Sequence, residues 1–154
     1  MPKLFAWKET DSVDVDLLDR QHQALFEVAQ ELYDALSRAE GMEVAEDVFS
    51  RLMDYSTNHF QAEENLMEKQ QYPRLKTHRE EHRAFADELR NFKKAFQAGN
   101  KNVVVNLLPY LQQWIKDHVQ GADHQYGEFL KTPRRPAGEG CRSLGNQRGC
   151  SEGG

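Results

Sequence analysis

Histidines and carboxylates recur along this chain at spacings that would place them together on helix faces. The pairs are His59 with Glu63, His78 with His82, and His118 with Asp123, and His22 stands alone upstream. Residues four apart on a helix differ by roughly 40° around its axis, so the first two pairs each face one way. These seven side chains exceed what one tetrahedral zinc needs. They suit two octahedral metal ions that share carboxylates. Imidazole and carboxylate together suit iron among the plausible metals.

Four stretches of apolar periodicity would position these ligands. They predict helices over about residues 16–38, 44–70, 72–99 and 102–130. Pro73 suits the first position of the third helix. Short connections make neighbouring helices antiparallel, so we predict an all-α, up-down-up-down four-helix bundle. This topology brings all four ligand groups to one end of the bundle.

The five ligand histidines and Glu63 occupy inward positions of these apolar stripes. A single histidine there is usually a hydrogen-bonded core residue. Burying five histidines and a carboxylate in the core would cost considerable free energy, because each buried polar group needs a partner. Metal coordination would satisfy all of them together.

The two ends of the chain differ from the helical part. Residues 1–15 are expected to form a non-helical arm, packed across the bundle through Phe5, Trp7, Val13 and Val15. Residues 1–130 would be one domain, and residues 131–154 a disordered tail rich in glycine. Both cysteines, Cys141 and Cys150, lie in this tail, so thiolate ligation within the bundle is excluded.

Composition excludes several classes of protein. The net charge of -5 gives no nucleic-acid footprint, and no stretch approaches the length of a membrane span. The N-terminus has no apolar run followed by a cleavage site, so a cytoplasmic location is expected.

Several neighbouring side chains have simpler interpretations. His124 and Glu64 each follow a proposed ligand but point elsewhere, so we expect both to face solvent. Asp19 either accepts a hydrogen bond from His22 or is an exposed acid of the first turn. Pro109 interrupts the fourth apolar pattern, so this helix either kinks there or begins near Asn106.

The spacing of His118 and Asp123 is one residue too long for a regular helix. Five residues place two side chains roughly 140° apart at 100° per residue. We therefore predict a local widening near Gly121 with i to i+5 hydrogen bonds, a feature that often marks functional sites. The alternative is an unbroken helix from which Asp123 reaches sideways.

Four segments resemble the ligand helices of bacterial hemerythrins, and Trp7 in the arm also fits that pattern. They are D-R-Q-H-Q-A-L-F, H-F-Q-A-E-E-N-L-M, H-R-E-E-H-R-A-F and W-I-K-D-H-V-Q-G-A-D. The resemblance implies a non-haem di-iron centre that binds O2 reversibly. His78, His82 and His118 would complete one iron, and His22 and His59 would hold the other. Glu63 and Asp123 would bridge the irons beside an oxo or hydroxo group.

The resemblance leaves the second iron one open position, where O2 would bind. Apolar residues one turn from the ligands could line a dry O2 pocket, or could simply pack the core. They are Leu25, Phe60, Trp114, Ile115 and Val119.

Three functions compete on the sequence alone. The first is O2 storage, delivery or buffering, with an unidentified recipient protein as a possible partner. The second is an enzyme in which the same centre reduces peroxide or nitric oxide. The third is a sensor of O2 or iron, which the absence of a resemblance to any signalling domain weakens.

Overall fold

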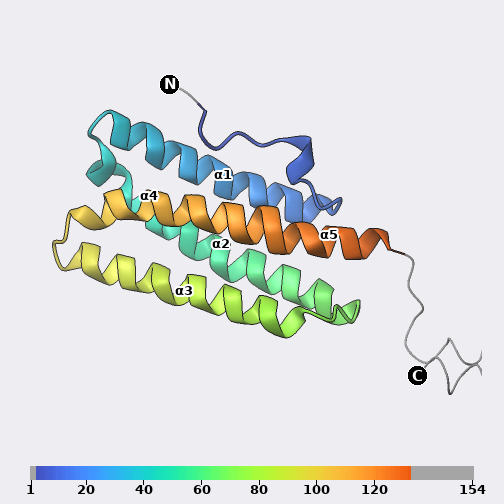
Figure 1. Cartoon of the computed structure of the whole chain (residues 1–154). Helices are drawn as coiled ribbons and strands as arrows, with labels where there is room; N and C mark the ends of the chain where they lie inside the picture. The colour runs from blue at the N-terminus through green and yellow to red at the C-terminus, as the bar shows by residue number, and fades with distance from the viewer. Residues whose placement is uncertain (1–2, 133–154) are drawn as a thin grey trace, which may run out of the picture.

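The computed structural model describes residues 3–132, which form an all-helical antiparallel four-helix bundle (Figure 1). Its elements are the 3₁₀ turn η1 (Glu9–Asp11), α1 (Asp16–Ser37), α2 (Gly41–Lys69), α3 (Leu75–Gln97), α4 (Asn102–Trp114), the π-helical segment η2 (Ile115–Asp123) and α5 (His124–Lys131). The last three run on without a break as the fourth helix of the bundle. The fold class is confirmed. Of the predicted disordered tail, residues 131–154, Lys131 is the last residue of α5, and residues 133–154 lie outside the described residues.

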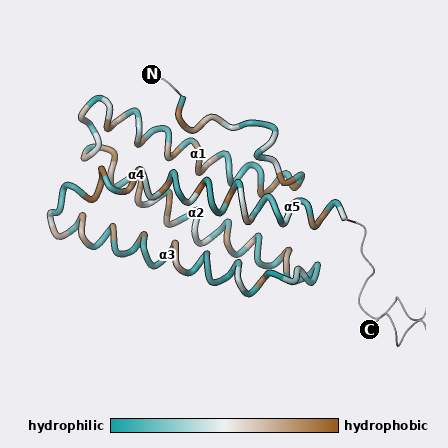
Figure 2. Tube along the Cα trace, viewed as in Figure 1, coloured by the Kyte–Doolittle hydropathy of each residue, from teal (hydrophilic) through white to brown (hydrophobic). Residues whose placement is uncertain are grey.

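The bundle is held together by one apolar stripe from each helix. Brown and teal segments alternate along every helix in Figure 2, as expected for amphipathic helices with one buried face. Large side chains from all four helices are fully buried in one cluster, among them Leu32, Phe49, Phe85 and Leu107. None of the helices in residues 3–132 combines the length and apolar character that a membrane span requires.

The N-terminal arm packs on the bundle as the sequence predicts. Phe5 and Val13 are buried, and Trp7 meets Phe26 edge-on with ring centroids 5.5 Å apart. The backbone N–H of Phe5 donates to Gln30 Oε1 of α1 at 3.0 Å. Asp11 Oδ1 accepts from Gln120 Nε2 of η2 at 3.1 Å, so the arm contacts both α1 and the fourth helix.

One proline lies outside its predicted position, and a second lies within the predicted fourth helix. Helix α3 begins at Leu75, so Pro73 lies in the turn before it and is not its first residue. The chain uses this turn to reverse direction, and a backbone N–H that proline lacks is not needed there. Helix α4 begins at Asn102 and continues through Pro109, which excludes a start near Asn106.

The predicted widening of the fourth helix is confirmed. Residues Ile115–Asp123 are π-helical, and this segment contains both His118 and Asp123. In a π-helix residues five apart are hydrogen-bonded neighbours, so the two side chains can face the same way. Gly121 is not required for steric reasons, since an added Cβ would lie 3.6 Å from the Lys116 carbonyl oxygen.

Two glycines of the fourth helix are therefore expected to respond differently to alanine. Gly121→Ala should keep metal binding and stabilise the fold by roughly 0.5–1 kcal/mol through helix propensity. Gly127→Ala places a Cβ 3.2 Å from the Val13 Cα, so the arm must shift at a cost of about 1–3 kcal/mol. Denaturant unfolding of the two variants measures both effects. Equal changes would show that the arm does not pack tightly against α5.

Candidate metal centre

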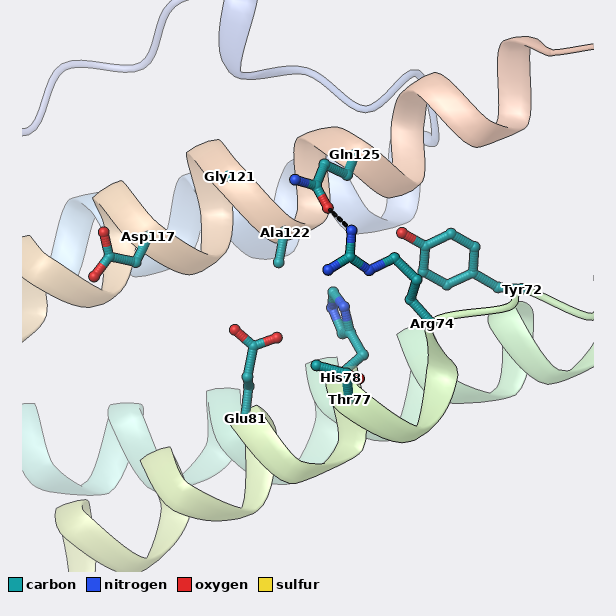
Figure 3. Close-up of a pocket in the computed structure, with 9 residues that line it drawn as sticks. All are labelled: Tyr72, Arg74, Thr77, His78, Glu81, Asp117, Gly121, Ala122 and Gln125. Carbon is teal, nitrogen blue, oxygen red and sulfur yellow. Dashed lines mark hydrogen bonds between the residues drawn. The ribbon is translucent and has the colours of Figure 1, made fainter.

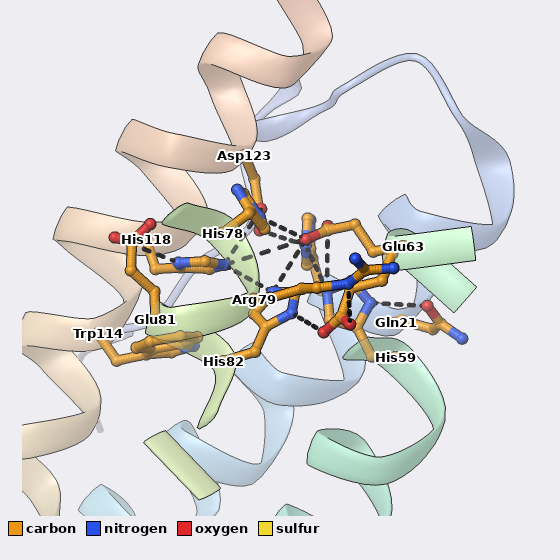
Figure 4. A network of polar contacts seen from close by, with 12 residues as sticks. Gln21, His59, Glu63, His78, Arg79, Glu81, His82, Trp114, His118 and Asp123 are labelled. Atoms are coloured by element: carbon orange, nitrogen blue, oxygen red, sulfur yellow. Dashed lines mark hydrogen bonds and ion pairs between the residues drawn. The ribbon is translucent and has the colours of Figure 1, made fainter. Parts of the chain in front are cut away.

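All seven predicted ligands converge at one buried place between the helices (Figure 4). Each is at most 2% exposed, although every one of them is polar or charged. They come from all four helices: His22 from α1, His59 and Glu63 from α2, His78 and His82 from α3, and His118 and Asp123 from η2. His124 is exposed and turns toward Glu128, as expected for a residue outside the cluster.

Three histidines and two carboxylate oxygens form the larger donor group. His78 Nε2 lies 2.6 Å from Glu63 Oε1 and 2.7 Å from Asp123 Oδ1. The Nε2 atoms of His82 and His118 are 3.0 Å apart. Together these five side chains offer donor atoms that lie within 4.8 Å of one another.

Two histidines and the other carboxylate oxygens form the smaller group. The Nε2 atoms of His22 and His59 are 3.1 Å apart. Asp123 Oδ2 lies 2.9 Å from His22 Nε2, and Glu63 Oε2 lies 3.3 Å from His59 Nε2. Both carboxylates therefore divide their oxygens between the two groups, which is the arrangement of bridging ligands.

Unpartnered atoms test whether a metal fits this cluster. Glu63 Oε2, Asp123 Oδ2, His22 Nδ1 and His118 Nδ1 are buried and lack a hydrogen-bond partner. Asp123 Oδ2 and His22 Nε2 are 2.9 Å apart, but their arrangement does not have the geometry of a hydrogen bond. Buried carboxylate oxygens without a donor are costly. Cations between the two carboxylates would satisfy these oxygens, so the donor set fits two metal ions.

Outer partners orient several of the imidazole rings. His59 Nδ1–H donates to Gln21 Oε1 at 2.7 Å, and His82 Nδ1–H donates to Glu64 Oε2 at 2.7 Å. These bonds leave each Nε2 free to face the centre, as in other metal sites. Glu64, which also pairs with Arg79, was therefore wrongly expected to be only a solvated surface charge.

Two further outer residues differ from the sequence interpretation. Asp19 neither contacts His22 nor stands free, because it accepts from Ser12 Oγ at 2.5 Å and from the Val13 N–H at 2.9 Å. It anchors the arm where α1 begins. Glu81, which the sequence analysis missed, lies 3.8 Å from His118 Nδ1. Its position one residue before His82 was the only signal.

The charges of the cluster shift the pKa values of its members. Burial lowers the pKa of His118, but the carboxylates of Asp123, Glu81 and Glu63 together outweigh burial and raise it to about 10. Burial likewise lowers the pKa of His78, and hydrogen bonds with Asp123 and Glu63 raise it to about 9. Burial raises the pKa of Asp123, yet the neighbouring His118, His22 and His78 together hold it well below its usual range. Metal ions must therefore displace protons from the metal-free cluster.

Aromatic rings cover the imidazoles on the side of the apolar core. Phe60 stacks on His82 with ring centroids 3.9 Å apart, and Trp114 stacks on His118 at 4.0 Å. Tyr55 stacks on His59 at 4.9 Å. All five residues predicted to line an O2 pocket belong to this core; Trp114 is partly buried and the other four are buried: Leu25, Phe60, Ile115 and Val119.

The fold and the cluster together define a class of protein, the four-helix bundles that hold metal ions between facing helices. A family model described as the hemerythrin HHE cation binding domain matches residues 13–130. The chain belongs to the hemerythrin family. It is 30% identical to the bacteriohemerythrin of Stenotrophomonas maltophilia (strain R551-3), over 83% of this chain and 82% of that protein. It is 31% identical to the bacteriohemerythrin of Pseudomonas aeruginosa (strain LESB58), over 81% of this chain and 80% of that protein. It is 26% identical to the myohemerythrin of Theromyzon tessulatum, over 82% of this chain and 93% of that protein.

Proposed function

We propose that this protein binds O2 reversibly at two non-haem irons that are held by the seven converging side chains. His78, His82 and His118 would hold one iron, His22 and His59 the other, and Glu63 and Asp123 would bridge them beside an oxo or hydroxo group. The observation that carries the proposal is the unequal division of donors. One group has five donor residues and the other has four, with both carboxylates shared.

This inequality favours the two-histidine iron as the place where O2 would bind. With one further bridging group, the five donors of the larger group would give its iron six ligands, and the four donors of the smaller group would leave one position open. When bound, a ferrous pair supplies two electrons to O2 and recovers them when O2 leaves. The protein contributes neutral imidazoles, which supply less negative charge than carboxylates and so disfavour further oxidation.

The surroundings of the two-histidine group support binding rather than turnover. Leu25 is fully buried and, with Tyr55 and His59, lines a cavity of about 330 Å³. Phe60, Ile115 and Val119 extend the apolar region within the same core, and Trp114 Nε1–H approaches the Tyr55 hydroxyl at 3.5 Å. On the core side of the cluster these buried apolar side chains would limit access of water and anions, which would slow oxidation of the irons. The cytoplasmic location and a recipient protein for O2 stay predictions.

Anaerobic reconstitution with ferrous iron tests the proposal. The protein is expected to take up two irons per chain and to bind one O2 per pair, with a visible absorption band that disappears when O2 is removed. Saturation at one iron per chain would contradict the two-metal assignment. Catalytic consumption of peroxide or nitric oxide, without a reversible O2 adduct, would instead identify an enzyme.

A further inference from the structure

A polar cavity opens beside the three-histidine group, between α3 and the π-helical part of the fourth helix (Figure 3). Its volume is about 200 Å³. At about 30 Å³ per water molecule, this is room for on the order of six waters. It is lined by Tyr72, Arg74, Thr77, His78, Glu81, Asp117, Gly121, Ala122 and Gln125.

His78 separates this cavity from the metal cluster. Its ring lines the cavity, while its Nε2 lies 2.6 Å from Glu63 Oε1 and 2.7 Å from Asp123 Oδ1. A rotation of this one side chain would connect the cavity to both bridging carboxylates. The cavity beside His59 on the other side of the cluster is different, because Leu25, Val28, Leu52 and Tyr55 make much of its wall apolar.

We propose that the polar cavity is the uptake port for the metal ions, in which Glu81 and Asp117 first hold a hydrated divalent cation. The ion then passes His78 and reaches the cluster. This inference rests on the metal site of the proposed function, and it assigns a transient second site to residues outside the seven ligands.

The charges along the wall favour a cation at the part of the cavity that Glu81 and Asp117 line. Glu81 and Asp117 contribute two carboxylates, and Glu81 lies 3.8 Å from His118 Nδ1, a buried nitrogen without a hydrogen-bond partner. Glu81 is 40% exposed, so it reaches both the solvent and the ligand shell. Arg74 donates to Gln125 at 3.0 Å, and Figure 3 shows its guanidinium beside His78, to one side of Glu81 and Asp117. The hydrogen bond holds this positive charge toward Gln125, so the part of the cavity at Glu81 and Asp117 stays available to a cation.

Small side chains keep the passage open. Gly121 adds no side chain to the wall, and Figure 3 shows the Ala122 methyl group pointing into the space between the helices, toward His78. A larger residue at position 122 would therefore fill the cavity without replacing a ligand.

Two rates test the proposal, and both are followed by absorption without any measurement of O2 binding. They are the rate of Co²⁺ uptake by the metal-free protein and the rate of Co²⁺ release from the loaded protein. Ala122→Leu is expected to slow both uptake and release by the same factor of about ten or more, because a blocked port raises one barrier for both directions. Asp117→Asn is expected to slow uptake severalfold through lost electrostatic attraction. Glu80→Gln is the matched control, since Glu80 carries the same charge on α3 but does not line the cavity.

Each outcome decides between a port and a structural effect. Unchanged uptake in Ala122→Leu, or faster release with unchanged uptake, would overturn the proposal, as would equal slowing in Asp117→Asn and Glu80→Gln. If Ala122→Leu no longer takes up two ions per chain, Thr77→Leu fills the cavity from the facing wall and gives the same comparison. Failure of the unmodified protein to bind Co²⁺ would refute the metal site itself and with it the port.

Discussion

Glu63→Ala is expected to abolish binding of both metal ions. Glu63 turns Oε1 toward His78 and Oε2 toward His59, so one substitution removes a donor from each group. It also removes one of the two carboxylates that both donor groups share. Loss of an outer partner costs about 10–100-fold in metal affinity, and loss of a shared ligand should cost more. Metal analysis after anaerobic reconstitution is expected to give a content near zero.

Two variants at neighbouring positions serve as controls for Glu63→Ala. Glu64→Gln changes the adjacent carboxylate, which accepts from His82 Nδ1–H, and should weaken affinity about 10–100-fold while two ions still bind at saturation. His124→Ala removes an exposed histidine next to Asp123 and should leave metal content unchanged. Glu63→Ala and His124→Ala behaving alike would show that the ligands of α2 and the fourth helix are wrongly assigned.

The ligand positions could be predicted because burial and spacing constrain the same residues. A histidine on an apolar stripe must face the core, and antiparallel helices bring such positions to one level. The π-helical segment followed from the same constraint, since His118 and Asp123 cannot share a face of a regular helix. Here a geometric conflict in the sequence predicted a departure from regular structure.

The outer partners could not be predicted in this way because they act between helices. Gln21 lies on α1 and orients His59 on α2, and Glu64 on α2 orients His82 on α3. A helical projection places Glu64 about 100° from Glu63. The projection omits the neighbouring helix α3, where His82 lies within hydrogen-bonding distance of the Glu64 side chain. Asp19 was misassigned for the same reason, because its partners belong to the arm.

Removal of the metal ions is expected to lower the melting temperature on the order of 10 °C or more. An ion present at a thousandfold excess over its Kd stabilises the folded state by about 4 kcal/mol. In a domain of this size each kcal/mol corresponds to a few degrees. Calorimetry of the metal-free and anaerobically reconstituted protein measures the difference. Glu63→Ala serves as the control, and ferrous iron should not raise its melting temperature.

The difference in melting temperature between the reconstituted and the metal-free protein is expected to increase from pH 6 to pH 8. In the metal-free protein the pKa values of His78 and His118 are raised to about 9 and about 10. Their contribution to stability is complete below the unfolded pKa of about 6.5 and is lost as the pH rises toward the folded values. Metal ions bind the neutral imidazoles, so metal affinity increases over the same range. A melting-temperature difference that stays constant or narrows from pH 6 to pH 8 would show that the metal ions do not replace protons on these histidines.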